Sequence, residues 1–411
     1  MSLFRIRSDI HPLDKAPGIR LHHGTAMAAA AVVLALVLNA ANLPAPLYVV
    51  YKQRFGFSEL TLTLVFAVYV VGSIAAMTFL GKVSDYVGRR PVLFAGIALA
   101  ALGTLIFLFT FNVTTLFAAR IVTGLSVGLT GTACVAWIAE LQPQGDQGAA
   151  ARMTTAATMM GLGLGPLIAG LVAEFAPYPL RLPFLIYLVG LIPPALVVWT
   201  VHETVKHKRP LTSVPLTPQL SVPSDIAILF GALAATGFVA FSMMGFYSAL
   251  IPSLLANSLH IESHAAGGAV IFFMFVCGTI AIALSLMWSS RVSTYLGLAL
   301  IPPGVALLVA AQHFGSLALL LAASAIGGAS GALGFCGSLQ VVNEIAPAGR
   351  RAAVVSSLLV ICYGGLSLPV IGIGVLTAAS GAGVADLVFA IVLCALAAIA
   401  AGICWRYLKE R

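Results

Sequence analysis

The chain has 411 residues, of which 60% are hydrophobic and 8% are charged, and its formal net charge is +8. A soluble globular domain has about 45–50% apolar and about 25% charged residues, so this composition excludes a water-soluble domain. The apolar runs are continuous and long enough to cross a bilayer, and they lack the two-residue alternation of a membrane β-barrel. The composition therefore predicts an all-α membrane protein.

The distribution of residues argues against two other classes of function. Basic residues are spread over many short loops, so we expect no nucleic-acid partner despite the positive charge. The six cysteines all lie inside apolar runs and form no C-x-x-C pair, so neither a metal site nor a disulfide framework is indicated. No cluster of His, Asp, Glu or Cys falls at membrane depth. We therefore expect neither an enzyme nor a bound cofactor.

The chain begins with a polar segment, 1–24, which is too charged for the core of a signal peptide. Apolar runs follow, at roughly 26–50, 59–80, 91–110, 114–138, 153–175, 182–201, 226–251, 266–288, 294–311, 316–341, 352–378 and 384–405. The stretch 202–224 is polar and rich in Pro, Ser and Thr, as linkers are. We therefore predict a tail (1–24), a six-helix half (25–201), a linker (202–224), a second six-helix half (225–405) and a C-terminal tail (406–411).

Positive charge predicts how these twelve spans are oriented. An even number of spans places both termini on one side of the membrane. The loops on the other side carry only Lys52, Arg54 and Arg181, and every other Lys or Arg outside the spans falls with the termini. Cytoplasmic loops carry the excess of Lys and Arg. We therefore expect both tails and the linker to be cytoplasmic, in a multi-pass protein of a cytoplasmic (inner) membrane.

The halves echo each other weakly. The 114–138 run is followed by Ala-Glu-Leu-Gln-Pro with Glu140, and the 316–341 run is followed by Asn-Glu-Ile-Ala-Pro with Glu344. Repeated halves are expected of transporters whose binding site lies at the repeat interface.

The turn at 81–91 reads G-K-V-S-D-Y-V-G-R-R-P and gathers charge between two apolar runs. Its spacing, G-x-x-x-D-x-x-G-R-R, resembles the loop between the second and third helices of major facilitator superfamily transporters. The resemblance implies twelve helices in two pseudo-symmetric six-helix halves, each built of inverted 3+3 repeats. It also implies that this loop latches the outward-facing state, with Asp85 set against the start of the eleventh span near Ala352. The latch residues are Gly81, Asp85, Gly88, Arg89 and Arg90, and the counterpart loop 289–293 keeps only Arg291.

Arg120 is the one basic residue inside a span. It shares a helix face with Gly124 and Gly128, which lets a helix or a ligand come close. The run from Arg120 to Gly124 resembles the family's R-x-x-x-G motif, whose arginine is associated with proton transfer or with holding anionic groups. The alternative is an arginine that snorkels to the outer edge of the membrane.

A third motif covers 161–170, with Gly161, Gly165, Pro166 and Gly170. It resembles the signature G-x-x-x-G-P-x-x-x-G of proton-linked exporters, which usually ends in two glycines where this chain has Ala169. The alternative is ordinary small-residue helix packing. In the 26–50 run, Asn39 and Asn42 share a face and need partners, from another helix or from a substrate.

No carboxylate falls at mid-membrane depth, where a proton carrier would be expected. Glu174, at the outer end of the 153–175 run, is the nearest candidate, and its alternative is a solvated helix end. The resemblance implies a cavity lined by Asn39, Asn42, Phe66, Tyr69, Arg120, Phe241, Met244, Tyr247, Ser338, Gln340 and Tyr363, which suits neutral or weakly anionic amphiphiles. We expect a monomeric, proton-coupled exporter of small organic compounds, most like drug/proton antiporters. The alternative is a facilitator or importer of a small neutral or anionic metabolite.

Overall fold

The computed structural model describes residues 23–142, 146–205, 207–214, 220–347 and 350–408, and these residues contain helices but no strand. The amino-terminal part holds α1 (His23–Asn42), η1 (Ala45–Leu47), α2 (Tyr48–Phe55), α3 (Glu59–Ala75), η2 (Ala76–Leu80), α4 (Val83–Val87), α5 (Arg89–Leu108), α6 (Val113–Leu141), α7 (Gln147–Phe175), α8 (Leu182–Gly190) and α9 (Ile192–Thr200). The rest holds η3 (Leu211–Ser213), α10 (Ala227–Ser258), α11 (His264–Leu284), η4 (Ser285–Met287), α12 (Ser290–Ala299), α13 (Ile301–His313), α14 (Leu317–Ile345), α15 (Arg351–Ser380) and α16 (Ala382–Leu408).

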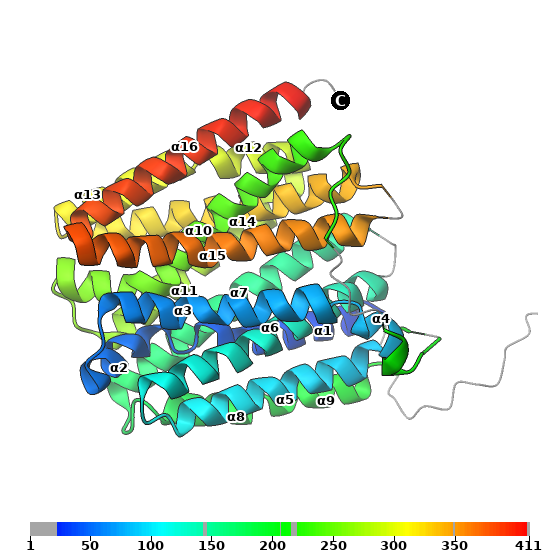
Figure 1. Cartoon of the computed structure of the whole chain (residues 1–411), viewed down its shortest axis with the longest axis horizontal. Helices are drawn as coiled ribbons and strands as arrows, with labels where there is room; N and C mark the ends of the chain where they lie inside the picture. Colours follow the sequence, from blue (N-terminus) through cyan, green and yellow to red (C-terminus); the bar gives the residue numbers. More distant parts are fainter. Residues whose placement is uncertain (1–22, 143–145, 206, 215–219, 348–349, 409–411) are drawn as a thin grey trace, which may run out of the picture.

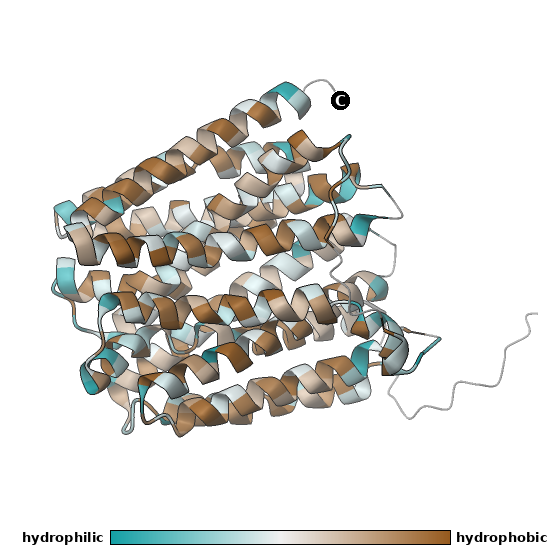
Figure 2. Cartoon of the chain, in the orientation of Figure 1, coloured by the Kyte–Doolittle hydropathy of each residue, from teal (hydrophilic) through white to brown (hydrophobic). Residues whose placement is uncertain are grey.

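Twelve helical segments of the described chain are long and apolar enough to cross a membrane, which confirms the predicted spans. Figure 2 shows hydrophobic residues across the middle of the bundle and hydrophilic residues at its two ends. Several spans extend beyond their predicted ends: the one predicted at 226–251 runs over Ala227–Ser258. Hydropathy detects only the part that is apolar, whereas backbone hydrogen bonds continue the helix into the polar surface.

The first span is broken rather than continuous. α1 ends at Asn42. Pro44 directly precedes the short helix η1, and Pro46 lies within it; η1 then leads into α2. A proline donates no backbone hydrogen bond, so the break leaves carbonyl groups at the end of α1 without their usual helical partners.

The two halves repeat the same packing. Ser126 on α6 donates a hydrogen bond to the carbonyl of Gly96 on α5 at 2.7 Å. Ser330 on α14 donates to the carbonyl of Gly297 on α12, also at 2.7 Å. These matching pairs align the third and fourth spans with the ninth and tenth. All-α architecture, twelve spans and two halves therefore agree with the predicted fold class.

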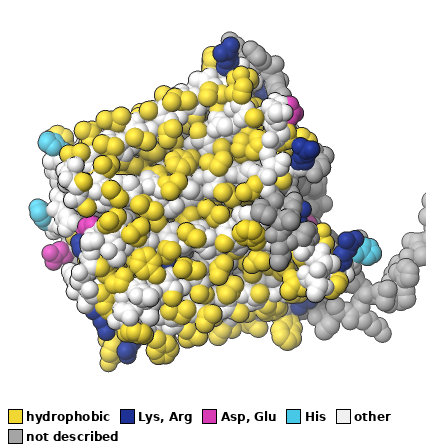
Figure 3. Space-filling model, in the orientation of Figure 1, with side chains coloured by type: hydrophobic (Ala, Val, Ile, Leu, Met, Phe, Trp, Pro, Cys, Tyr) yellow, Lys and Arg dark blue, Asp and Glu magenta, His cyan; other side chains and the backbone are white. Residues whose placement is uncertain are grey.

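The loops divide the bundle into two unlike ends. We call the end that carries α4, residues 202–214 and Arg351 the basic end, and the other the opposite end; the basic end is on the right in Figure 1. Figure 3 shows a broad hydrophobic surface between the ends, with the charged side chains gathered at its margins. Of the predicted tails and linker, residues 1–22, 206, 215–219 and 409–411 lie outside the described residues.

The halves meet along two pairs of helices, α7 with α11 and α3 with α15. At α3 and α15 the contact is close, because a Cβ on Gly374 would lie 3.0 Å from Thr63 Cγ2. Thr63 is near the start of α3 and Gly374 is near the end of α15, so this contact closes the opposite end of the bundle.

Candidate functional site

A central cavity of about 370 Å³ lies between the halves. It reaches from Asn42 and Ser248, deep in the bundle, to Lys82, Asp85 and Ser356 at the basic end. No residue of the described loops at the opposite end lines it. The cavity therefore opens toward the basic end.

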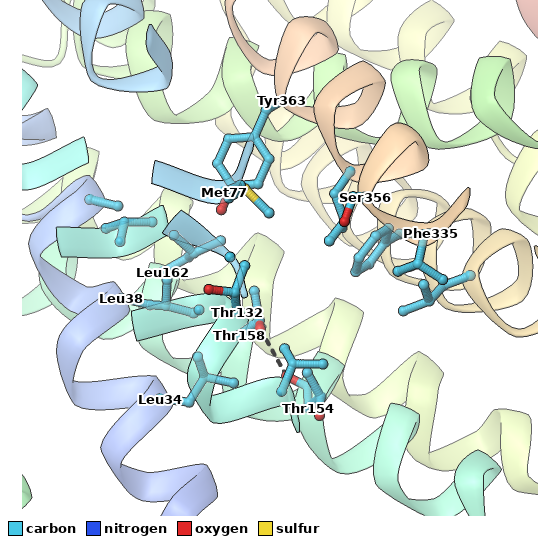
Figure 4. A pocket seen from close by; sticks show the side chains of 18 of the residues that line it. Leu34, Leu38, Met77, Thr132, Thr154, Thr158, Leu162, Phe335, Ser356 and Tyr363 are labelled. Atoms are coloured by element: carbon cyan, nitrogen blue, oxygen red, sulfur yellow. Dashed lines mark hydrogen bonds between the residues drawn. The ribbon is translucent and has the colours of Figure 1, made fainter. Parts of the chain in front are cut away.

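The walls are largely apolar, with scattered hydroxyl groups from both halves. Figure 4 shows Leu34, Leu38, Thr132 and Thr158 of the first half facing Phe335, Ser356 and Tyr363 of the second. Thr154 and Thr158 are one turn apart on α7, and Thr158 Oγ1 donates to the Thr154 carbonyl at 2.8 Å. These threonines were not among the predicted lining residues, although their i, i+4 spacing in the sequence placed them on one face.

The structure divides the residues that the sequence assigned to the cavity. Asn42, Tyr69, Phe241, Met244 and Tyr363 line it. The others do not, and they are Asn39, Phe66, Arg120, Tyr247, Ser338 and Gln340.

Asn42 joins three helices at the inner end of the cavity. Its Nδ2 donates to the carbonyl of Leu162 on α7 at 3.2 Å and to Ser248 Oγ on α10 at 2.9 Å. The bond to Ser248 crosses from one half to the other. The amide therefore finds its partners on other helices and also lines the cavity, and its contact with a substrate stays a prediction.

Asn39 is buried one turn earlier on α1 and packs against α7. A Cβ on Gly165 would lie 2.7 Å from the Asn39 backbone oxygen and closer to Oδ1. That Oδ1 has no hydrogen-bond partner among the described residues. Asn39 therefore fills space between α1 and α7 and does not touch the cavity.

Arg120 is fully buried, and its guanidinium is held by backbone carbonyls rather than by an acid. Nη1 donates to Ala41 at 2.6 Å, and Nη2 donates to Phe66 at 3.1 Å. The guanidinium carbon lies 4.2 Å from the ring centre of Tyr69. Ala41 is in the last turn of α1, where carbonyls lack helical donors and a cation is favoured. Arg120 therefore turns into the protein at the break in the first span, and it does not reach the outer edge of the membrane.

In the 81–91 turn, Arg89 is buried and carries most of the interactions. It forms ion pairs with Asp85 and with Glu140 on α6, both at 2.5 Å. Its Nη1 also donates to Ser84 Oγ. Such charge-assisted bonds fix α4 against α5 and α6.

The linker completes the turn. Gly88 has a φ of +113°, which strongly favours glycine. Glu203 accepts hydrogen bonds from the backbone N–H groups of Arg89, at 2.9 Å, and of Arg90, at 3.2 Å. Arg90 Nε donates to the carbonyl of Val198 at the end of α9 at 2.8 Å. Glu203 thereby caps α5, a role that the sequence did not indicate because the capping residue comes from a distant segment.

The latch between the 81–91 turn and the eleventh span stays a prediction, and the structure places residues of this turn in the lining of the cavity. Gly81 and Asp85 line the cavity mouth, across from Ser356 on α15, and Asp85 pairs with Arg89 in its own half. The side chain of Ala352, near which the partner was expected, lies outside the described residues.

The counterpart turn in the second half is simpler. By the alignment above, Ser290 takes the position of Arg89, and Glu344 takes that of Glu140. Ser290 Oγ donates to Glu344 at 3.0 Å, so a hydrogen bond from an uncharged hydroxyl replaces the ion pair.

The 161–170 glycines use two faces of α7. Gly161 and Gly165 pack on the backbone of α1 at Ala35 and Asn39. Gly170 packs on α11, where a Cβ would lie 3.3 Å from Gly268 Cα. Pro166 lies within α7 without ending it, and its carbonyl faces Gly268. The motif therefore joins α7 to α1 within one half and to α11 across the halves.

Glu174 lies at the end of α7 beyond this contact, exposed at the opposite end of the bundle. Its Oε2 accepts a hydrogen bond from the backbone N–H of His264, the first residue of α11, at 2.8 Å. A carboxylate is favoured at a helix N-terminus. The structure therefore places Glu174 in the closed end and not in the cavity.

Two pseudo-symmetric six-helix halves around a cavity open at one end define a membrane transporter. The chain belongs to the major facilitator superfamily, because the model of the Major Facilitator Superfamily matches residues 27–369. Members of this family are transporters rather than enzymes.

Named relatives include two drug-resistance proteins and a sugar–proton symporter, and each match is partial. The chain is 28% identical to the class B tetracycline resistance protein of Escherichia coli, over 56% of this chain and 58% of that protein. It is 24% identical to the quinolone resistance protein NorA of Staphylococcus aureus, over 51% and 54%. It is 27% identical to the arabinose–proton symporter of Bacillus subtilis, over 27% and 24%. The chain thus spans less than two thirds of the length of these relatives.

A solved structure matches almost the whole chain. A bacterial homologue of the human lysosomal transporter Spinster, in an inward-facing and unoccupied conformation, has a TM-score of 0.71 and 14% identity. The match covers 96% of this chain and 99% of that one. At this identity the similarity concerns the fold.

Proposed function

We propose that this transporter exports small organic compounds from the cytoplasm in exchange for protons, by alternating access of one cavity to the two sides of the membrane. The observation that carries the proposal is the cavity itself. It is open at the basic end and closed at the other by the exporter-type glycine motif, which packs α7 against α11. Rocking of one half against the other would reverse these two openings.

The orientation follows from the positive-inside rule. Lys82, Arg89 and Arg90 lie at the basic end, as do Arg350 and Arg351, whereas Lys52, Arg54 and Arg181 lie at the other. We therefore assign the basic end to the cytoplasm of a cytoplasmic-type membrane, and the structure to the inward-facing state. One chain encloses the cavity, which suits a monomer.

The lining favours neutral or weakly anionic amphiphiles. Among the cavity-lining residues the only carboxylate is Asp85, at the mouth, and it pairs with Arg89. A lipophilic cation would find no counter-charge deeper in the cavity. Apolar walls with scattered threonine hydroxyls instead suit a compound with a hydrophobic body and a few hydrogen-bonding groups. Tetracycline and a quinolone are apt first probes, given the names of two relatives.

The missing acid also favours a second candidate, a facilitator or importer of a neutral or anionic metabolite. Everted membrane vesicles with a pH-sensitive dye separate the two. Export coupled to protons predicts that each transported probe dissipates the pH gradient, in vesicles that contain the chain and not in vesicles without it. Accumulation of a probe without any change in the gradient contradicts proton antiport and favours the facilitator.

A further inference from the structure

The hydrogen bond between Asn42 and Ser248 is the feature of the cavity that links its contents to its closed end. Both residues line the cavity, yet they are only 2% and 1% exposed because they cover each other. Asn42 ends α1 in the first half, and Ser248 is in α10 of the second, 206 residues away. The bond therefore lies where the two halves meet above the cavity.

The two hydrogen bonds of the Asn42 amide are not equivalent. The bond to Leu162 stays within the first half and orients the amide, whereas the bond to Ser248 exists only while the halves are close. Opening the opposite end separates α1 from α10, so the Ser248 bond must break. Losing this hydrogen bond costs about 0.5–1.5 kcal/mol even where water replaces Ser248, so the empty cavity resists this opening.

A substrate can remove that resistance. Thr154, Thr158 and Leu162 follow one another at one-turn intervals on α7, so a row of polar groups extends for about 12 Å from the threonines to the Asn42 amide. A compound that reaches the inner end with a carbonyl, amide or ether oxygen offers Asn42 a new acceptor in place of Ser248.

We propose that Asn42 and Ser248 form an interlock that holds the empty transporter open to the basic end, and that a substrate releases it by accepting the Asn42 hydrogen bond. Asn42 is thus a specificity-determining residue that requires an acceptor on the substrate. Ser248 is a positioning residue that suppresses opening without cargo. The substrate part rests on the proposed function, whereas the interlock is a property of the empty protein.

Hydrogen exchange measured by mass spectrometry on the purified, empty chain tests the interlock. The relevant peptides cover the end of α7 and the start of α11, which close the opposite end. Ser248→Ala removes the cross-half bond. Ser242→Ala is the matched control, because Ser242 is equally buried on the same helix but bonds only the Phe238 carbonyl, at 2.7 Å. One lost hydrogen bond predicts exchange about five-fold faster in Ser248→Ala, and no change in Ser242→Ala. Equal exchange in the two variants overturns the interlock.

Transport of tetracycline tests the substrate part. Asn42→Leu should transport tetracycline at least about five-fold less well than Ser248→Ala, which keeps the amide. If the wild-type chain transports tetracycline and Asn42→Leu does so equally well, the proposal that the substrate replaces Ser248 as the acceptor for Asn42 is wrong. A third result is that the wild-type chain transports neither tetracycline nor a quinolone, while hydrogen exchange is still faster in Ser248→Ala than in Ser242→Ala. In that case the proposed function fails and the interlock stands.

Discussion

Adding one methyl group at Gly268 should open the end of the bundle that is closed in this structure. Gly268 on α11 faces Pro166 and Leu167 on α7, across the boundary between the halves. In Gly268→Ala, the new Cβ would lie 2.9 Å from the carbonyl carbon of Pro166, and closer to its oxygen, where ordinary contacts begin at 3.4 Å. The neighbour is backbone and cannot rotate away, so the helices must separate by at least about 0.5 Å.

Overpacking of this kind typically costs about 1–3 kcal/mol. The cost applies to the state in which α7 and α11 touch, because in the opposite state these helices separate. The population open at the opposite end should therefore rise by between about 5-fold and about 150-fold. Gly268 and the two α7 residues that it faces do not line the cavity, so the affinity for a substrate within either state should not change.

The neighbouring glycine supplies a matched control. In Gly267→Ala the nearest atoms to the new Cβ belong to Pro252, at 3.6 Å, which is an ordinary contact. Both substitutions raise helix propensity by the same amount, so that effect cancels in the comparison. Hydrogen exchange at the start of α11 should accelerate in Gly268→Ala only. Identical exchange in the two variants would refute the claim that this contact keeps the opposite end closed.

Substitutions at three further residues test the other contacts. Arg120→Leu removes a charge-assisted bond to Ala41, so we expect a loss of about 1.5–3 kcal/mol in stability, seen as a lower melting temperature in detergent. Asp85→Asn should slow transport cycles while leaving membrane insertion intact, because the latch predicted from the family resemblance needs the carboxylate; substrate flux per inserted molecule measures this. Glu174→Gln keeps an acceptor for the His264 N–H but loses the charge, so exchange at the start of α11 should increase less than in Glu174→Ala.

Each of these expectations has a contrary result. An unchanged melting temperature in Arg120→Leu would mean that water satisfies the Ala41 carbonyl as well as the guanidinium does, with no loss of stability. Wild-type flux in Asp85→Asn would remove the turn from the transport cycle. Equal exchange in the two Glu174 variants would show that the charge of the carboxylate contributes nothing to the closed end.

The sequence was sufficient for the spans and for one of the closest helix contacts. Hydropathy located the spans, because lipid demands continuous apolar helices. The i, i+4 spacing of Arg120, Gly124 and Gly128 predicted a closely packed face, and Gly124 and Gly128 do lie against the backbone of α3. Which groups would hold the guanidinium could not be predicted, because the answer depends on how Pro44 and Pro46 break the first span.

The hydrogen-bond partners of the cavity residues could not be predicted from local sequence patterns. Ser242 and Ser248 lie in the same apolar helix and look alike in the sequence, yet only Ser248 meets Asn42. The sequence pattern places Glu203 in a polar linker, and only the folded chain shows that its carboxylate caps α5. Both contacts join segments that are far apart in the sequence.

The two glycine-lined faces of α7 have a consequence for how cargo preference could diverge among descendants of this chain. Gly161 and Gly165 lie against the backbone of α1, and Gly170 lies against that of α11. A larger residue at any of these sites would push the helices apart, so selection should remove such variants. Thr154 and Thr158 face open space on the same helix. New cargo preferences should therefore arise by substitution of these threonines more readily than by substitution of the glycines.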